Sequence, residues 1–540
     1  MSTKTDSGFS PPLAEPAGGS PSRRRFAGAL GWSAAVAIIV SLLMMLGLMA
    51  AGPNQAVAKI PKTWPAPPYS FHLRLTNLEV GFIVYAMMVL AAAGVALGLL
   101  AVARGARPNL KLLAAGAGTA VALMVVLPPA GSTDSLSYAT YGRIALVGHN
   151  PYSYTPEQLI KSHDPVGEQT TTHWVDTPSV YGPVQTAAEW GAAKLGGTSI
   201  SRIVFWLKLL FGVSFGAVAF GLDRVLRRDP AARARAHMLW TVNPLMLWAL
   251  VGSAHCDALT AGFGVLGLLV IRPGRTDAEA SDGQRLSGRK DALRHHPPTV
   301  GRSFVSGLLI GAAAGVKIPF ALLGVGPAWA ARRSPRALAA MVAGAFITLV
   351  PGYLIAGQVS VKVLQSQSSL VAFDSFWRLV FPKFGGFPSD PHWVPSLLMP
   401  ATYVLAAVLA ALLLWRLPHG YDRLPAVRPA LALMLAWLLV WPMQRPWYDA
   451  IAFALLAIFP ATKLDWLMII RTLPAAIAMA TTGVGPNRNG PVWLVNLEHR
   501  MGWNWTPAVL LAVVAAVILI SVLSIWSPRR PPPLAGVTPA

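Results

Sequence analysis

Long apolar stretches that lack Asp, Glu, Lys and Arg recur along the whole chain. A helix needs about 20 mostly apolar residues to cross the core of a bilayer, so stretches of this kind are candidate transmembrane helices. Only 12% of the residues are charged, which is about half the charged share of a typical soluble domain. We therefore predict an all-α polytopic membrane protein with about fourteen transmembrane helices, at residues 27–51, 78–103, 111–129, 203–222, 236–253, 257–271, 303–316, 318–331, 338–357, 396–416, 427–442, 448–462, 465–481 and 505–526.

Some of these stretches are shorter than a bilayer and lie beside polar residues. Residues 257–271, 303–316 and 318–331 are therefore expected to be broken or bent spans. Lys208 and Arg471 also fall inside expected spans. A charge at the middle of a span costs about 2.5 to 3.5 kcal/mol. We therefore interpret both residues as lying near a span end or snorkelling to the interface, and assign them no function.

The basic residues lie mainly in alternate connections between the expected spans. The chain has 44 Lys and Arg against 22 Asp and Glu, a formal net charge of +22. Short loops rich in Lys and Arg stay in the cytoplasm, so these connections and both termini are predicted to be cytoplasmic. This placement explains the charge without nucleic-acid binding. The side chains that set the orientation are Arg104, Arg107, Lys111, Arg224, Arg227, Arg228, Arg233, Arg235, Arg332, Arg333 and Arg336.

Three segments lack apolar periodicity and are rich in Gly, Ser, Pro or charged residues. Residues 1–26 and 527–540 are expected to be cytoplasmic tails, the first of them disordered, and residues 272–302 are expected to form a mobile cytoplasmic loop. The membrane domain then runs from residue 27 to residue 526.

The composition and the motifs exclude several classes of protein. The single cysteine, Cys256, excludes an intramolecular disulfide and any cysteine-rich metal site. The sequence has no G-x-x-x-x-G-K-[ST] phosphate loop, so a nucleotide-driven pump is not expected. We see no repeat of fixed period and no pair of matched halves, which disfavours a secondary transporter. No cofactor is expected.

The longest connection on the outer side, residues 130–202, is neither low in complexity nor purely polar. A short amphipathic helix on the membrane surface is predicted there from a spacing of three and four between Tyr138, Tyr141, Ile144, Ala145 and Val147. A stretch rich in Pro and aromatic residues follows. Long structured loops usually carry function, and the further residues singled out in this loop are Arg143, Asn150, Tyr152, Trp174, Asp176 and Tyr181.

Asp134 lies where the expected span at 111–129 emerges on the outer side. One interpretation is an N-cap for the following helix, because Asp or Thr before L-S-Y suits capping. The other is a functional carboxylate held near lipid, whose basicity is set by desolvation and by neighbouring cations. The residues themselves leave both interpretations open.

Breaks between other spans are expected to bring further polar residues to the same face, namely His255, Asp257, Lys317, Arg445 and Tyr448. Lys317 interrupts an apolar run, so it should have an anionic partner or snorkel outward. His255 and Asp257 could ligate a metal, but two ligands without a third nearby make a weak site. We therefore expect no metal site.

A carboxylate, several cations and many aromatic side chains suit a sugar joined to a membrane-anchored phosphate. Tyr and Trp stack on sugar faces, and Arg and Lys neutralise phosphate. A phosphate leaves as a stable anion, so one general base suffices, whereas a glycosidase needs a second carboxyl group. Direct in-line attack would invert the anomeric centre. The D-x-D metal motif of nucleotide-sugar enzymes is missing from the outer side.

A series of short motifs adds a resemblance to a known family. The motifs are T-D-S-L-S-Y-A-T-Y-G-R at 133–143, G-H-N-P-Y at 148–152, W-V-D-T-P-S-V-Y-G-P at 174–183, N-P-L at 243–245, A-H-C-D-A-L at 254–259, A-G-V-K-I-P at 314–319 and R-P-W-Y at 445–448. With these motifs the chain resembles the polyprenol-phosphate-mannose-dependent α(1→6) mannosyltransferases of actinobacterial lipomannan synthesis, which belong to the GT-C superfamily.

The resemblance implies a helical membrane bundle whose catalytic acid, in the first large outer loop, maps onto Asp134. It implies polyprenyl-phosphate-mannose as donor and a lipid-linked mannan as acceptor, used on the extracytoplasmic face of the cell membrane. We expect Lys317 and Arg445, with Arg143 in reserve, to bind the donor phosphate. The residues expected to contact sugar or acceptor are Tyr138, Tyr141, Asn150, Tyr152, Trp174, Asp176, Tyr181, His255, Asp257 and Tyr448.

Two other functions stay open at this point. A carrier or flippase of lipid-linked sugars could use the same cations without making a bond, and for it a catalytic base would be dispensable. A purely structural subunit of a cell-wall complex is disfavoured by the many polar groups expected inside the membrane or at its interface.

Overall fold

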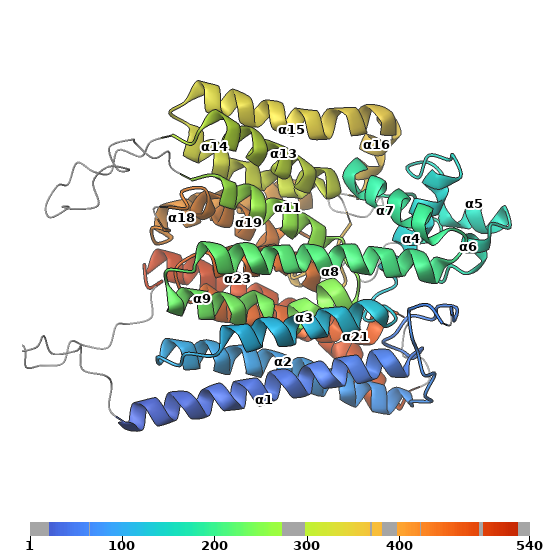
Figure 1. Cartoon of the computed structure of the whole chain (residues 1–540), viewed down its shortest axis with the longest axis horizontal. Coiled ribbons are helices and arrows are strands. Elements are labelled where there is room, and N and C mark those ends of the chain that lie inside the picture. The colour runs from blue at the N-terminus through green and yellow to red at the C-terminus, as the bar shows by residue number, and fades with distance from the viewer. Residues whose placement is uncertain are drawn as a thin grey trace, which may run out of the picture.

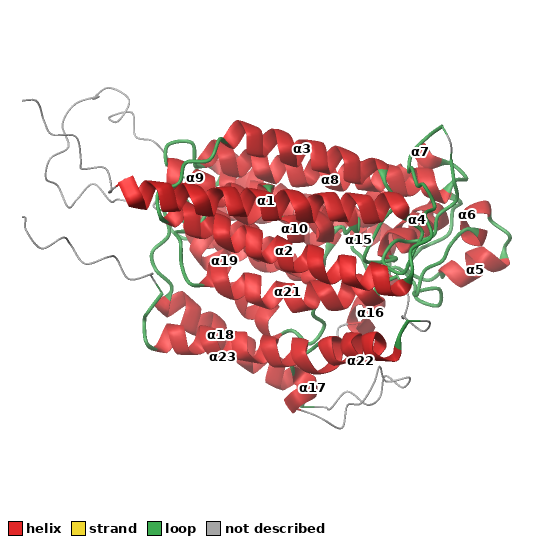
Figure 2. Cartoon of the chain, turned by 90° about the horizontal axis from the view of Figure 1, so that it is seen from below, coloured by secondary structure: helices red, strands yellow, loops and turns green. Residues whose placement is uncertain are grey.

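The computed structural model describes residues 21–63, 65–272, 297–367, 370–380, 397–421, 423–484 and 490–526. These residues form helices and loops and contain no β-strand, as Figure 2 shows. The predicted tail at 527–540, most of the predicted tail at 1–26 and most of the loop predicted at 272–302 lie outside the described residues.

The longest helices are long and apolar enough to cross a membrane. Seven such helices are present in the described part of the chain. They are α1 (Pro21–Ala51), α2 (Asn77–Ala103), α8 (Ile200–Val225), α15 (Pro335–Ala356), α18 (Leu398–Arg416), α21 (Leu464–Thr482) and the continuous run of α22 (Val492–Arg500), η6 (Met501–Trp505) and α23 (Thr506–Val522). The protein is therefore an all-α polytopic membrane protein, as predicted.

The other expected spans are helical but short or broken. One pair, which runs from α9 (Pro230–Ala236) through η1 (His237–Thr241), α10 (Pro244–Leu247) and η2 (Trp248–Gly252) into α11 (Asp257–Val270), bends by 118° at its break. With this pair counted as one span, the described residues hold up to eight, fewer than the fourteen expected. The shorter apolar helices are α3 (Leu110–Val126), α13 (Val300–Val316), η3 (Ile318–Gly324) with α14 (Val325–Ala331), α19 (Val427–Val440), and η5 (Pro446–Tyr448) with α20 (Asp449–Ala457).

The bundle has two different ends. Figure 1 shows α4 (Asp134–Leu146), α5 (Pro156–Lys161), α6 (Pro165–Glu168) and α7 (Pro183–Gly196) together at one end, which we call the loop end. Helices α9 and α14 lie at the opposite end, where the last turn of α8 carries Arg224 and the connections beside α9 and α14 carry Arg228 and Arg332. We call this the basic end. The short helices α16 (Gln358–Gln367) and α17 (Trp377–Val380) follow α15.

Lys208 and Arg471 are both buried within the bundle. The Lys208 Nζ, in α8, donates to the carbonyls of Leu127 at 2.7 Å and Pro128 at 3.3 Å. The Arg471 guanidinium, in α21, pairs with the Asp449 carboxylate. The interpretation of these residues as snorkelling side chains is therefore wrong. Each charge is kept inside because polar partners from other segments replace its hydration.

Helix α4 is buried on most of its sides, so the prediction of a surface helix over residues 138–147 is wrong. Nearly every residue from Ser135 to Ile144 is buried, because α7 and α8 pack on the helix. Gly142 permits this packing: a Cβ at this position would collide with the backbone of Glu189 in α7. The small and aromatic residues of α4 thus serve close helix packing rather than a membrane surface.

Candidate functional site

The segment that leads into α4 is fixed by backbone hydrogen bonds to two other parts of the loop end. Ala58 donates to Pro129 at 3.0 Å, and Gly131 donates to Ala56 at 2.7 Å. Ala130 donates to Gly252, at the end of η2, at 3.1 Å. The connection between α1 and α2 and the broken helix therefore meet immediately before Asp134.

Asp134 is the first residue of α4, and its carboxylate does not cap the helix. The N-cap residue is Thr133, and no side-chain capping bond forms. Instead, the Trp174 indole Nε1 donates to Oδ1 of Asp134 at 3.3 Å. The interpretation of Asp134 as an N-cap is therefore wrong. Since 17% of the Asp134 side chain is exposed, the carboxylate is still open to a reactant.

The environment of Asp134 makes its carboxylate more basic. Burial raises the pKa of Asp134 above the usual carboxyl value. Lys317, Arg445 and the hydrogen bonds from Trp174 and Ser132 lower the pKa, but they offset burial only in part. A carboxylate with a raised pKa is a better proton acceptor, which suits a general base.

His255 lies at the break between η2 and α11, beside Asp134. Its Nδ1 is 3.6 Å from Oδ2 of Asp134 and 3.5 Å from the hydroxyl of Tyr138. The imidazole stacks on the Trp447 indole with 3.6 Å between ring centroids. The 118° bend at this break thus places the buried His255 beside the carboxylate of Asp134.

Lys317 ends α13 and precedes the 3₁₀ helix η3. Its Nζ donates to Oδ2 of Asp257 at 2.6 Å. The same Nζ lies over the ring of Tyr448 at 4.5 Å and over that of Tyr181 at 5.7 Å. The expectation of an anionic partner for Lys317 is confirmed, and the side chain does not snorkel.

Arg445 precedes η5 and is also buried beside an acid. Its Nη1 donates to Oδ1 of Asp374 at 3.3 Å and to the carbonyl of Gln444 at 3.2 Å. Both Arg445 and Lys317 are close enough to act electrostatically on Asp134. Two cations from different breaks in the bundle therefore favour the charged form of one carboxylate.

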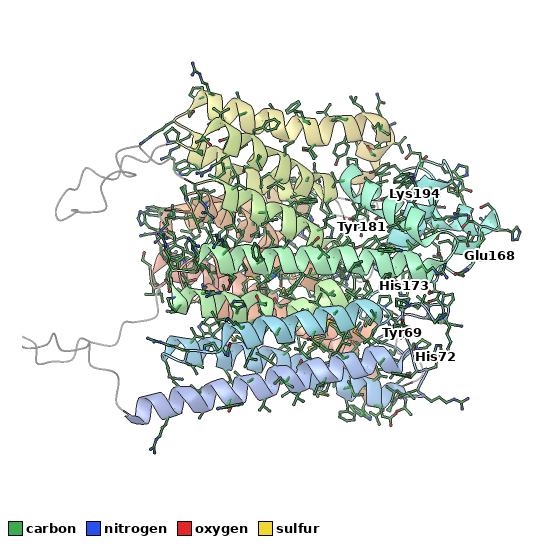
Figure 3. All side chains as sticks on the ribbon, viewed as in Figure 1. Tyr69, His72, Glu168, His173, Tyr181 and Lys194 are labelled. Carbon is green, nitrogen blue, oxygen red and sulfur yellow. The ribbon has the colours of Figure 1, made fainter. Side chains whose placement is uncertain are left out.

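Aromatic side chains complete the cluster. Tyr138 is buried, and its ring meets Tyr181 edge to face with 5.0 Å between centroids. The Tyr181 hydroxyl donates to the Tyr138 hydroxyl at 3.4 Å. Figure 3 shows Tyr181 where the loop end meets the bundle, whereas Glu168 lies at the far tip. The Asp134 cluster thus comprises Asp134, Tyr138, Trp174, Tyr181, His255, Asp257, Lys317, Arg445, Trp447 and Tyr448.

Several buried polar atoms in and beside this cluster have no hydrogen-bond partner within the described part of the chain. They are the hydroxyls of Thr133 and Ser135, Nε2 of His255 and Oδ1 of Asp257. Buried polar atoms are nearly always hydrogen-bonded in native proteins, so unpaired ones require an explanation. The unpaired atoms therefore mark this cluster as a candidate functional site rather than ordinary helix packing.

The structure places the other expected site residues in the framework of the loop end rather than in the Asp134 cluster. Arg143 pairs with Asp164 at 2.8 Å, and the Tyr141 hydroxyl donates to the Thr177 carbonyl at 2.8 Å. Asn150 donates to the carbonyl of Ala356 at 3.1 Å, the Tyr152 and Thr186 hydroxyls lie 2.9 Å apart, and Asp176 is exposed.

Sequence reasoning missed two members of the site region. Trp447 stands inside the R-P-W-Y motif, and its aromatic type was the signal that could have selected it. Asp374 is an isolated acid in the stretch A-F-D-S-F, and its rarity among apolar residues was its signal. Among the described residues, no group of three or more His, Cys, Asp or Glu is arranged to hold a metal.

Comparison with curated proteins finds distant relatives that share one described activity. A probable alpha-(1->6)-mannopyranosyltransferase of Mycolicibacterium smegmatis is 28% identical over 144 residues, which cover 27% of this chain and 26% of that protein. Alpha-(1->6)-mannopyranosyltransferase B of Corynebacterium glutamicum is 23% identical over 250 residues, 45% of this chain and 41% of that protein. An alpha-(1->6)-mannopyranosyltransferase of Mycobacterium tuberculosis is 26% identical over 145 residues, 27% of this chain and 24% of that protein.

The chain thus aligns with between about a quarter and two fifths of the length of these relatives. No solved structure matches it. One family model, described as alpha-(1->6)-mannopyranosyltransferase, N-terminal domain, matches residues 34–333. The matched region contains Asp134, His255, Asp257 and Lys317, whereas Arg445 lies beyond it. Because this region is more than half of the chain, the protein belongs to the alpha-(1->6)-mannopyranosyltransferase family that the model describes.

Proposed function

We propose that this protein is a membrane mannosyltransferase that moves mannose from a polyprenyl-phosphate donor to a lipid-linked mannan acceptor. The transfer forms an α(1→6) linkage with inversion and takes place on the extracytoplasmic face. The observation that carries the proposal is the partly exposed carboxylate of Asp134, on which the charges of Lys317 and Arg445 act. The family membership and the names of the relatives support the choice of mannose.

The geometry supports different roles for the aromatic and the basic side chains. Tyr181 and Tyr448 offer ring faces and hydroxyls near Lys317 and suit a sugar. The Lys317 ammonium has three N–H donors, and its bond to Asp257 uses one. A phosphate oxygen can accept another. In this arrangement the donor phosphate lies by the cations and its sugar faces Asp134.

The transfer step balances with one general base. The acceptor O6 attacks C1 of the donor mannose while Asp134 takes the O6 proton. The C1–O bond to phosphate breaks, and its electron pair leaves with polyprenyl phosphate. The leaving group gains negative charge as that bond breaks, so a cation that stabilises it acts mainly in the transition state. Attack opposite the leaving group turns a β-linked donor into an α-linked product.

The direct test uses purified protein, labelled polyprenyl-phosphate-mannose and a short α(1→6) mannoside acceptor. We expect elongated product whose new linkage is cleaved by an α(1→6)-specific mannosidase. A protein that only carries lipid-linked sugars would move the donor across a vesicle membrane and leave the acceptor unchanged. That outcome would refute the proposed transferase.

We expect transfer to fall off at low pH because Asp134 must be deprotonated to act as a base. Since its pKa is raised, kcat should be lost as the pH falls through a value above the usual carboxyl range, about 3.9. Arg445 lowers this pKa, so Arg445→Met should move the acid limb to higher pH. Arg445→Lys keeps the charge, so the pH at which kcat is lost should stay the same. Equal acid limbs in the wild type and Arg445→Met would argue against this coupling.

We also expect the loop end to face the outside of the cell, because the basic end carries the Arg-rich connections. Cys256, the single cysteine, is buried and should give little background to thiol labelling. Lys161→Cys, exposed at the loop end, should react with an impermeant thiol reagent in intact cells. Arg228→Cys, at the basic end, should react only after the membrane is opened. The reverse pattern would overturn the orientation.

A further inference from the structure

The two side chains that meet at Nδ1 of His255 and Oδ2 of Asp134 differ in their access to a reactant. His255 is fully buried, whereas 17% of the Asp134 side chain is exposed. A general base must come within hydrogen-bond reach of the proton that it takes. Asp134 can meet that requirement and His255 cannot, so the histidine needs a different role.

The Asp134 carboxylate influences which nitrogen of the His255 imidazole carries the proton. A histidine proton resides on the nitrogen whose hydrogen bond favours it. Nδ1 of His255 faces the carboxylate of Asp134 at 3.6 Å, and a lone pair in that position would be repelled by the negative oxygen. A proton on Nδ1 can therefore be donated toward the carboxylate, and the Tyr138 hydroxyl, 3.5 Å from the same nitrogen, can also accept it. The other nitrogen, Nε2, is buried and has no hydrogen-bond partner within the described residues.

The imidazole is held rigidly from two sides. The Trp447 indole stacks on it with an interplanar angle of 16°. The preceding residue, Ala254, has a φ of +58°, a left-handed conformation that costs a non-glycine residue energy and persists only where its surroundings impose it. The His255 backbone N–H also donates to the Leu250 carbonyl at 3.1 Å. The ring is thus fixed in place before any substrate binds.

The two oxygens of Asp134 face different partners. Oδ1 accepts from the Trp174 indole at 3.3 Å, and Oδ2 faces Nδ1 of His255. The Trp174 bond holds Oδ1, the imidazole limits where Oδ2 can lie, and the other lone pairs stay available to a reactant. The 3.6 Å separation exceeds a hydrogen bond, as catalytic contacts often do before substrate binds.

We infer that His255 is a positioning residue for the transfer reaction, whose Nδ1–H orients Asp134 toward the acceptor hydroxyl. This inference rests on the proposed function and adds a residue to it. The histidine touches neither reacting atom and acts only through Asp134. A misplacement of about 1 Å can cost about 10²-fold in rate, so loss of this orientation should lower kcat and leave the donor KM unchanged.

Two substitutions separate the N–H donor from the aromatic ring. His255→Phe keeps a ring that can stack on Trp447 and removes the donor. His255→Asn removes the ring and can place an amide N–H near the position of Nδ1. We expect His255→Phe to lose about tenfold to a hundredfold in kcat and His255→Asn to stay close to wild type. Size-exclusion profiles and thermal melts of both purified variants check that they fold.

The outcomes separate the inference from the function on which it rests. Normal turnover in His255→Phe, or an equal loss in both variants, overturns the inference because the N–H donor is then not the feature that matters. Wild-type protein that transfers no mannose under any condition refutes the proposed function itself. If the wild type transfers mannose, Asp134→Asn abolishes the transfer and His255→Phe leaves it intact, the proposed function stands. In that case only the positioning role of His255 is rejected.

Discussion

Asp134→Asn should lower kcat for mannose transfer by about 10²-fold to 10⁴-fold, the usual contribution of a positioned general base. The amide keeps the size of the side chain but does not take the proton of the acceptor hydroxyl. It can still accept the bond from the Trp174 indole through its oxygen. Since Asp134 supplies no side-chain capping bond, the variant should fold as the wild type does. Steady-state kinetics with varied donor and acceptor measure the effect.

A matched control for Asp134→Asn is available in the same segment, residues 130–202. Glu168 is an exposed acid at the tip of the loop end and pairs only with the exposed His163 among the described residues. Glu168→Gln changes the net charge by the same amount and should leave turnover unchanged. If Asp134→Asn retains near-normal transfer while its thermal melt matches that of the wild type, Asp134 is not the base.

Removal of the Lys317 ammonium should lower turnover by about 10²-fold to 10³-fold, as loss of a preorganised charge-stabilising donor does. Lys317→Met alone would also leave Asp257 as a buried acid without its cation. Breaking a buried ion pair in this way costs about 3 to 5 kcal/mol of stability. The single substitution therefore combines a folding defect with a loss of chemistry.

The double variant Lys317→Met with Asp257→Asn separates these effects because it leaves no unpaired charge. We expect it to melt near the wild-type temperature and still to lose turnover. Asp257→Asn alone reports the part due to the acid. As a control, Arg235→Met with Asp465→Asn removes another buried pair, at the basic end, and should change stability more than turnover. Wild-type kinetics in the first double variant would mean that Lys317 only neutralises Asp257.

The expected spans could be predicted because hydropathy is a property of local sequence. Every expected apolar segment is helical in the structure, and Asp134 could be selected because it follows one of those segments directly. The bent and short spans were harder to count because a helix break depends on which polar residues find partners. At the turn beside His255, for example, the left-handed backbone position is occupied by Ala254 and not by glycine, so the sequence does not indicate it.

The partners of the charged side chains were decided by the tertiary structure alone. Lys317 lies 60 residues from Asp257 along the chain, and Arg445 lies 71 residues from Asp374. The apolar pattern requires that such charges be paired, because desolvation makes an isolated one costly, but it cannot name the partner. The same limit applies to Lys208, read as a snorkelling residue, and to α4, read as a surface helix. The helical membrane architecture and the choice of Asp134 as candidate base could both be predicted from the order of the residues, because these features depend on local hydropathy and position. Which segments pack together, and so which histidine and which cations surround that carboxylate, depended on long-range contacts that only the folded chain contains.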